Sequence, residues 1–111
     1  MRTIYIAGKI TGLPFRRTYL KFLLREIMLL FYGFKPTNPM RDVPNDWEYG
    51  QQMSMCLYLV HENDCIYLSH NWRNSPGAKK ELKTYIDRGK TEIYMFDLFG
   101  LRKITKKELW G

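Results

Sequence analysis

The chain has only two cysteines and two histidines, and no apolar run approaches the roughly 20 residues of a membrane helix. Cys56 and Cys65 lie in apolar contexts, which indicates reduced thiols in an intracellular setting and not a disulfide framework. Together with His61 and His70 they form no zinc-binding spacing, so we expect neither a metal nor another cofactor. The first residues resemble a strand and not a signal peptide, so we expect a cytoplasmic protein without a membrane segment.

Repeats, linkers and low-complexity segments are also missing. A length of 111 residues suits one domain, and we expect a single domain over residues 1–111. The formal net charge is +7, but the basic residues are spread along the chain. This spread favours solvated helix faces over a nucleic-acid groove, and a small phosphorylated ligand would suit the charge as well. We therefore expect no nucleic-acid partner, and a nucleic-acid-binding protein remains an alternative that rests on charge alone.

Strand-like and helix-like segments alternate along the chain. The expected strands are residues 3–7, 34–36, 64–68 and 91–96, and the expected helices are 15–32, 47–61 (capped by Asp46), 76–88 and a short one after the Thr105-x-x-Glu108 capping box. This alternation predicts an α/β fold. We expect a single-domain Rossmann-like (flavodoxin-like) three-layer sandwich around a mostly parallel sheet of four to five strands.

Two features of these segments leave alternatives open. The apolar face of the helix expected over 15–32 is unusually broad, which suits either a helix wedged between sheet and loops or a subunit interface. The loop over 37–46 is long enough for a functional role. Just after it, Trp47 and Tyr49 are placed either to stack on a base or to anchor the loop.

The stretch Trp72–Glu81 contains the strongest local signals for a binding site. Ser75 suits a helix N-cap, Pro76 suits the first helical position, and Gly77 lets a ligand approach the backbone closely. A strand followed by small residues and a helix N-terminus is a potential anion site. Glu81 follows about one turn inside the helix, at the border of its apolar face, where a carboxylate can face a cleft. The spacing alone also suits an ordinary surface glutamate.

Gly8-Lys9-Ile10-Thr11-Gly12 follows the first expected strand as a loop. It is not a dinucleotide-binding fingerprint, and by itself it is weak evidence for phosphate binding. Its place matters more, because ligands of open α/β sheets bind beyond the carboxyl ends of the strands. Gly8, Lys9, Ile10 and Gly12 are therefore candidate substrate contacts.

Two stretches resemble a known family. Tyr5-x-x-Gly8 and Trp72-x-x-Ser75-x-Gly77-Ala78-x-x-Glu81 are similar to motifs of a small uncharacterised phage and bacterial family (DUF4406-like). That family looks like a branch of the nucleoside 2-deoxyribosyltransferase and nucleotide N-glycosidase superfamily. The resemblance covers most of residues 1–96.

The resemblance implies roles for individual residues. Glu81 matches the superfamily's nucleophile, which attacks the anomeric carbon of the sugar, and Tyr5 matches the tyrosine that orients it. Ser75 stands where enzymes for unphosphorylated nucleosides carry aspartate, so it favours a 5′-phosphorylated substrate, with Gly77 and Trp72 as further contacts. Members commonly assemble with a neighbouring subunit, so we expect a homodimer or higher homo-oligomer.

The implied function is an N-glycosidic-bond hydrolase or pentosyltransferase that acts on a (deoxy)nucleoside 5′-monophosphate, with the small-molecule nucleotide as its partner. One departure concerns Cys56, which falls near the position where active members carry an acid that assists the leaving base. A thiol is a poor proton donor there, and Asp64, at the start of the next strand, is another acid whose distance from the site stays open at this point. The alternative is a non-catalytic nucleotide-binding or sequestering module.

Overall fold

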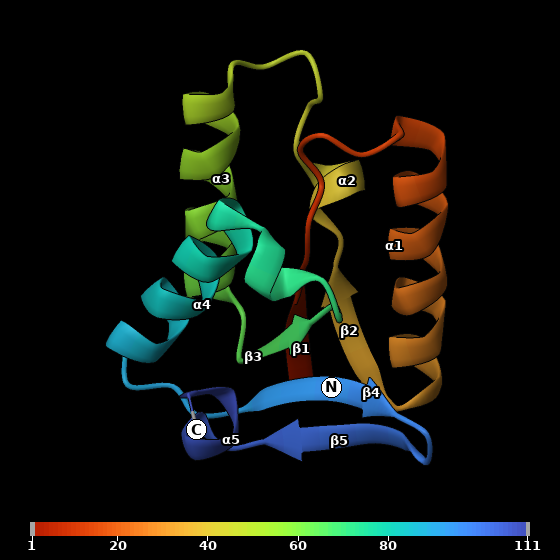
Figure 1. Ribbon diagram of the computed structural model, residues 1–111, viewed down its shortest axis with the longest axis vertical. Coiled ribbons are helices and arrows are strands. Elements are labelled where there is room, and N and C mark those ends of the chain that lie inside the picture. Colours follow the sequence, from red (N-terminus) through yellow and green to blue (C-terminus); the bar gives the residue numbers. More distant parts are fainter. Residues whose placement is uncertain (1, 111) are drawn as a thin grey trace.

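The computed structural model describes residues 2–110 and consists of a central sheet with helices on both faces (Figure 1). The strands are β1 (Arg2–Ala7), β2 (Phe34–Thr37), β3 (Cys65–Leu68), β4 (Ile93–Asp97) and β5 (Gly100–Ile104). The helices are α1 (Phe15–Phe31), α2 (Pro39–Asp42), α3 (Tyr49–Glu62), α4 (Pro76–Asp87) and α5 (Lys106–Trp110), with a 3-10 turn, η1 (Trp72–Asn74), before α4.

The sheet has the strand order β2-β1-β3-β4-β5, with β1 to β4 parallel and β5 antiparallel to β4. This is the order of flavodoxin-like folds, in which ligands bind where the chain changes direction between β1 and β3. The predicted α/β class and mostly parallel sheet are thus confirmed. Pro36, which lacks a backbone N–H, is tolerated because β2 is an edge strand.

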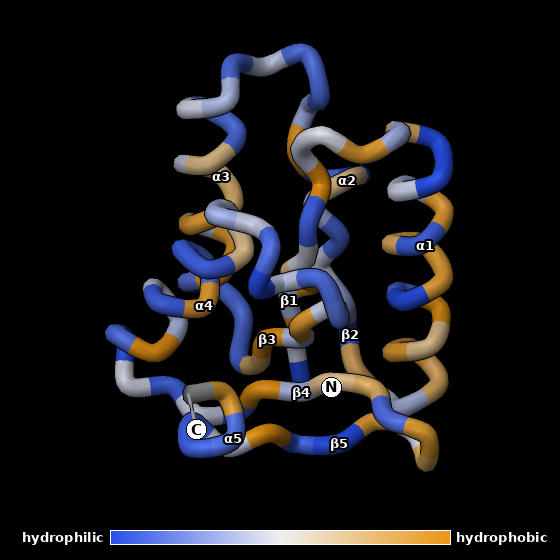
Figure 2. Tube along the Cα trace, viewed as in Figure 1, coloured by the Kyte–Doolittle hydropathy of each residue, from blue (hydrophilic) through white to orange (hydrophobic). Residues whose placement is uncertain are grey.

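Alternate residues of the central strands face opposite layers of the molecule. Ile4 and Ile6 of β1 pack with α1, whereas Tyr5 and Ala7 pack into the cluster formed with α3, α4 and α5. Figure 2 shows hydrophobic residues on these strands and along much of α1. Because successive strand side chains alternate, the tyrosine of β1 lies on the same side of the sheet as α4.

Three local features differ from the sequence predictions. The loop over 37–46 contains the short helix α2, where Asn38 Oδ1 accepts a hydrogen bond from the Met40 N–H at 3.0 Å. The predicted Asp46 cap is wrong: α3 begins at Tyr49, and Gln51 Oε1 accepts from the N–H of the actual cap residue, Glu48, at 3.2 Å. Strand β5 was not expected as a separate element.

The predicted capping box at the C-terminal end is confirmed. Glu108 N–H donates to Thr105 Oγ1 at 3.3 Å, and the Thr105 hydroxyl donates to a Glu108 carboxylate oxygen at the same distance, just before α5. Over the described residues 2–110, the helices are too short or too polar to cross a bilayer.

Candidate functional site

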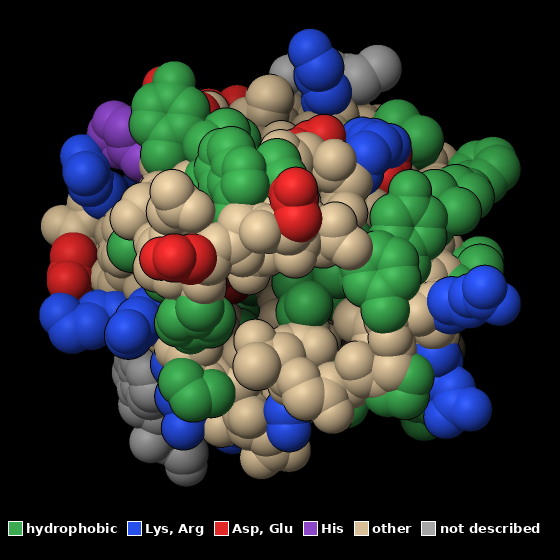
Figure 3. All heavy atoms as spheres, turned by 90° about the horizontal axis from the view of Figure 1, so that it is seen from above, with side chains coloured by type: hydrophobic (Ala, Val, Ile, Leu, Met, Phe, Trp, Pro, Cys, Tyr) green, Lys and Arg blue, Asp and Glu red, His purple; other side chains and the backbone are tan. Residues whose placement is uncertain are grey.

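A cavity of about 450 Å³ opens at the carboxyl edge of the sheet. Its walls come from the loop after β1, the segment after β2 that includes α2, the first half of α3, and the start of α4. These segments follow three neighbouring parallel strands, which is where the fold concentrates ligand sites. Figure 3 looks onto this edge and shows the surface hollowed there, with hydrophobic side chains around the opening.

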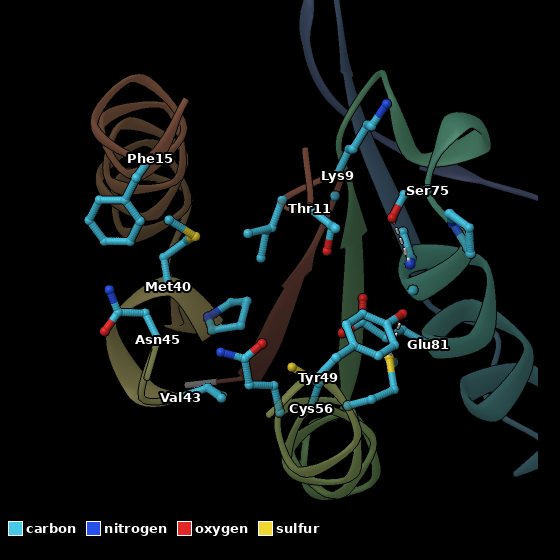
Figure 4. Close-up of a pocket in the computed structure, with 18 residues that line it drawn as sticks. Lys9, Thr11, Phe15, Met40, Val43, Asn45, Tyr49, Cys56, Ser75 and Glu81 are labelled. Carbon is cyan, nitrogen blue, oxygen red and sulfur yellow. Dashed lines mark hydrogen bonds between the residues drawn. The ribbon is translucent and has the colours of Figure 1, made fainter. Parts of the chain in front are cut away.

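The two sides of the cavity differ in character (Figure 4). Ser75 and Glu81 of the α4 segment line one side, whereas Phe15, Met40 and Val43 line the other. The cavity therefore has a polar end beside α4 and an apolar end beside α1 and α2. A ligand with one polar and one flat apolar part would match this division.

The polar end is built on the N-terminus of α4. Ser75 is the predicted N-cap, and its Oγ accepts a hydrogen bond from the Ala78 N–H at 3.1 Å, with Pro76 at the first helical position. Ser75 is buried, yet its hydroxyl lines the cavity. A methyl group on Gly77 would meet its nearest protein atoms, Met53 Sδ and Tyr49 Oη, at 3.6 Å, which is ordinary contact. Packing therefore leaves room for a side chain at Gly77.

Glu81 is the only acidic residue among the cavity-lining side chains of the described chain. It is buried, and the Tyr5 hydroxyl donates a hydrogen bond to its carboxyl group. Tyr5 is itself fully buried behind the cavity wall, so it can hold the carboxyl without exposure to a ligand. The structure thus brings together the two candidate catalytic residues, which are 76 positions apart in sequence.

Burial sets the pKa values of Glu81 and of the neighbouring Cys56. Desolvation raises the pKa of Glu81 to about 8, although hydrogen bonds from Tyr5 and the Cys56 thiol oppose the rise. Burial also raises the pKa of Cys56 to about 12, with the nearby Glu81 charge adding to the effect. The thiol therefore stays protonated at neutral pH. The site holds one carboxyl group poised to change charge near physiological pH, next to a thiol that does not.

The loop after β1 is fixed by contacts with the loop after β3. Lys9 N–H donates to Asn71 Oδ1 at 3.1 Å. A Cβ atom on Gly8 would lie 2.8 Å from Ser69 Cβ, so close packing at this point requires glycine. Gly8, Lys9 and Ile10 line the cavity as predicted contacts, whereas Gly12 does not, and its φ of +83° serves a turn.

Two further candidates lie away from the cavity. Trp72 is buried in the hydrophobic cluster between the sheet and α4, and the Arg73 guanidinium lies over its ring at 4.8 Å. Asp64, considered as a substitute acid, lies at the amino end of β3 and accepts hydrogen bonds from Thr3 N–H and Oγ1, both at 3.2 Å. It belongs to the opposite edge of the sheet from the cavity.

Several lining residues were not singled out from the sequence, among them Phe15, Met40, Asn45, Gln52 and Met53. The length of the loop after β2 and the aromatic residues just after it are the sequence signals that point to this region. Tyr49, whose position predicts either stacking on a base or anchoring of the loop, lines the cavity. Trp47 precedes α3 and does not line it. Within residues 2–110, no three His, Cys, Asp or Glu side chains gather closely enough to hold a metal ion.

The fold and the site define an α/β protein with a ligand-sized cavity at the switch point of a parallel sheet and a buried carboxyl group in its wall. Residues 2–94 match the family described as "Domain of unknown function (DUF4406)", and the chain belongs to this family. A comparison with curated proteins finds no match.

Proposed function

We propose that this protein cleaves or exchanges the N-glycosidic bond of a (deoxy)nucleoside 5′-monophosphate, as a nucleotide N-glycosidase or a deoxyribosyltransferase-like enzyme. The observation that carries the proposal is the position of Glu81. Its carboxyl group lines the cavity about one helical turn from the Ser75 cap and receives a hydrogen bond from the buried Tyr5. A carboxylate placed in this way can act on the anomeric carbon of a sugar whose phosphate is held at the helix N-terminus.

The resemblance to the nucleoside 2-deoxyribosyltransferase and nucleotide N-glycosidase superfamily supports the same roles. In that superfamily the matching glutamate is the nucleophile and the matching tyrosine orients it. Here the two matching residues, Tyr5 and Glu81, come from β1 and α4 and are in direct contact. This contact is what the carried-over roles require.

The phosphate is assigned to the polar end of the cavity. Ser75 Oγ accepts from the Ala78 N–H, which leaves the hydroxyl hydrogen available to donate to a phosphate oxygen. The backbone at Gly77 is open to the cavity, and the helix N-terminus carries a partial positive charge of roughly half an elementary charge. An aspartate at position 75 would repel a phosphate, so the serine favours a phosphorylated substrate.

The base is assigned to the other end. Phe15, Met40 and Val43 supply apolar surface for a flat ring, whereas the Tyr49 hydroxyl lies beside Gly77 at the polar end. The amide side chains of Asn45 and Gln52 also line this region, and they offer both donors and acceptors to a base edge.

In the proposed reaction, a carboxylate oxygen of Glu81 bonds to the anomeric carbon as the carbon–nitrogen bond breaks. The electron pair leaves with the base, which takes a proton from water. Water then hydrolyses the glycosyl ester to release the sugar 5-phosphate, or a second base takes the sugar. The Tyr5 hydroxyl holds the carboxylate and stabilises its charge before attack and after release.

A non-catalytic nucleotide-binding module is the second candidate, and Cys56 is the observation that favours it. The side chain faces Glu81 in the cavity wall, and the raised pKa of its thiol makes it a poor acid for the leaving base. A protein that kept the phosphate and base sites and lost proton delivery would bind a nucleotide without cleaving it.

The test is chromatography of free base after incubation with a panel of nucleoside 5′-monophosphates and the matching nucleosides. Wild type should release base from at least one monophosphate and much less from its nucleoside, and Glu81→Ala should release none. Identical traces for wild type and Glu81→Ala across the panel would rule out the catalytic proposal. Calorimetry then separates the alternative: binding without turnover, weakened by Ser75→Asp and unaffected by Glu81→Gln, indicates a binding module.

A further inference from the structure

Helix α1 exposes an apolar stripe on the side opposite its buried face. Leu20, Leu24, Ile27 and Phe31 are between 41% and 86% exposed. Their spacing of four, three and four residues places them within about 60° of one another around the helix. The buried residues of the same helix, Thr18, Phe22, Glu26 and Leu29, face the sheet. In Figure 1, α1 stands at the outer side of its layer with this face uncovered.

The spacing of the stripe is that of a helix–helix seam. Apolar residues that alternate by four and three positions are the a and d positions of a heptad, whose side chains fit between those of a facing helix. Leu30, also half exposed, widens the stripe on one flank. We refer to Leu20, Leu24, Ile27, Leu30 and Phe31 as the α1 stripe.

The charges of α1 are distributed unevenly along its length. Arg16, Arg17, Lys21 and Arg25 all lie in its first two-thirds, its first turn has no acidic residue, and its last turn has no basic residue. This distribution opposes the helix dipole, because cations are unfavourable at the positive N-terminus and favourable at the negative C-terminus. A facing helix that ran in the opposite direction would place its negative end beside these arginines.

We propose that the α1 stripe pairs with the α1 stripe of a second copy of this chain, with the two helices antiparallel about a two-fold axis between Leu24 and Ile27. In this register Leu24 meets Ile27 of the second copy, and Leu20 meets Phe31. Arg17 then lies beside the C-terminal end of the facing helix, and the Arg16-Arg17 pairs of the two copies lie at opposite ends of the helix pair. The proposal is independent of the activity proposed above.

The area of the α1 stripe suits this occupant. With about 200 Å² for each fully exposed side chain of this size, the stripe leaves on the order of 600 Å² open per copy. A symmetric pair would bury roughly 1,200 Å² in total, which reaches the lower bound of specific, stable interfaces. The same patch serves both subunits, as two-fold pairing requires.

Sedimentation equilibrium at protein concentrations on the order of 100 µM tests the pairing. Wild type should be a dimer. Leu24→Glu, which places two carboxylates near the axis, should weaken the dimer by about 100-fold or more. Tyr58→Glu is the matched control, because Tyr58 is also about half exposed but lies on α3, and it should leave the dimer intact.

A wild-type monomer, or a Leu24→Glu dimer as tight as wild type, would overturn the proposal. So would a monomer that sediments with anionic vesicles, which would assign the stripe to a membrane surface.

Disulfide trapping tests the direction. A mixture of Leu20→Cys and Phe31→Cys should cross-link as a heterodimer under mild oxidation, whereas Leu20→Cys alone should not. In the antiparallel register the two copies of residue 20 are separated by roughly 16 Å along the axis, too far for a disulfide. Wild type, which keeps Cys56 and Cys65, is the control for background cross-linking. Efficient self-cross-linking of Leu20→Cys would contradict the antiparallel arrangement.

Discussion

Residues of strand β1 donate hydrogen bonds to two carboxyl groups that differ in their burial and in the direction of their pKa shifts. Thr3 donates to Asp64 at the amino edge of the sheet, and Tyr5, two residues later, donates to Glu81 beside the cavity. Asp64 is exposed, and the backbone and side-chain hydrogen bonds of Thr3 lower its pKa. Glu81 is buried, and desolvation raises its pKa to about 8. The same kind of pairing therefore gives a group at one edge that titrates only in acid, and a group at the other edge that titrates near neutral pH.

The largest predicted difference concerns stability against pH. Because its pKa is raised from 4.5, Glu81 keeps a proton in the folded state that the unfolded chain releases between about pH 4.5 and about pH 8. Folding stability should therefore fall across this window, by on the order of 4 kcal/mol. Denaturant unfolding of wild type and Glu81→Gln at both ends of the window measures it. Glu81→Gln should lose this dependence of stability on pH. If the variant keeps the wild-type dependence, a group other than Glu81 causes it.

Asp64 should act with the opposite sign. Its lowered pKa means that its contribution is present above the ordinary value of 3.8 and is lost as the pH falls through the folded-state pKa. Asp64→Asn should therefore reduce the dependence of stability on acid pH and leave the window governed by Glu81 unchanged. Acid titrations followed by circular dichroism distinguish the two groups.

Tyr5→Phe should break the buried pair. Removal of the hydroxyl leaves a buried carboxyl without this donor and should destabilise the fold by about 1–3 kcal/mol. Because the Tyr5 hydrogen bond lowers the pKa of Glu81, that pKa should rise further in the variant. Equilibrium unfolding near pH 7 measures the loss of stability, and the upper pH at which stability stops falling gives the folded-state pKa of Glu81. Thr3→Val, which removes the donor hydroxyl at the exposed pair, is the control and should change the unfolding midpoint less.

Two glycines at the edge of the cavity should respond differently to alanine. Gly8→Ala should destabilise the fold by about 1–3 kcal/mol, because its Cβ would clash with Ser69.

Gly77→Ala should be neutral or stabilise the fold by up to about 1 kcal/mol, since the methyl group meets only ordinary contacts and alanine favours the helix. The same variant should weaken nucleotide binding by about 10-fold, because its methyl group occupies the proposed phosphate site. Thermal unfolding and calorimetry measure the two effects, and unchanged binding by Gly77→Ala would remove the phosphate from this position.

Most of the fold could be predicted because its determinants are local. Apolar strands, helical spacing and the caps at Ser75 and Thr105 depend on residues close together in sequence. Strand β5 was missed because Arg102 and Lys103 suit an exposed edge, and only pairing with β4 makes the segment a strand. Residue preference alone predicts Asp46 as the cap, whereas the hydrogen bond between Glu48 and Gln51 determines where α3 begins.

The site was predictable only in part. Ser75, Gly77 and Glu81 share one strand–turn–helix unit, so their spacing was informative. Only the family resemblance predicts Tyr5, since no local pattern links it to a residue 76 positions later. Asn45 and Gln52 come to the cavity through the packing of the segment after β2, which no sequence pattern reveals. Trp72 looked like a ligand contact, but its ring is buried in the core.

Release of free base is the most direct test of the central claim that Glu81 performs chemistry while Asp64 supports the fold. Wild type, Glu81→Gln and Asp64→Asn are each incubated with a 2′-deoxynucleoside 5′-monophosphate between about pH 6 and about pH 9. Wild type and Asp64→Asn should release base at similar rates that rise with pH and level off above about pH 8, where Glu81 is ionised. Glu81→Gln should be slower by at least about 1,000-fold. Equal release by wild type and Glu81→Gln would contradict the account.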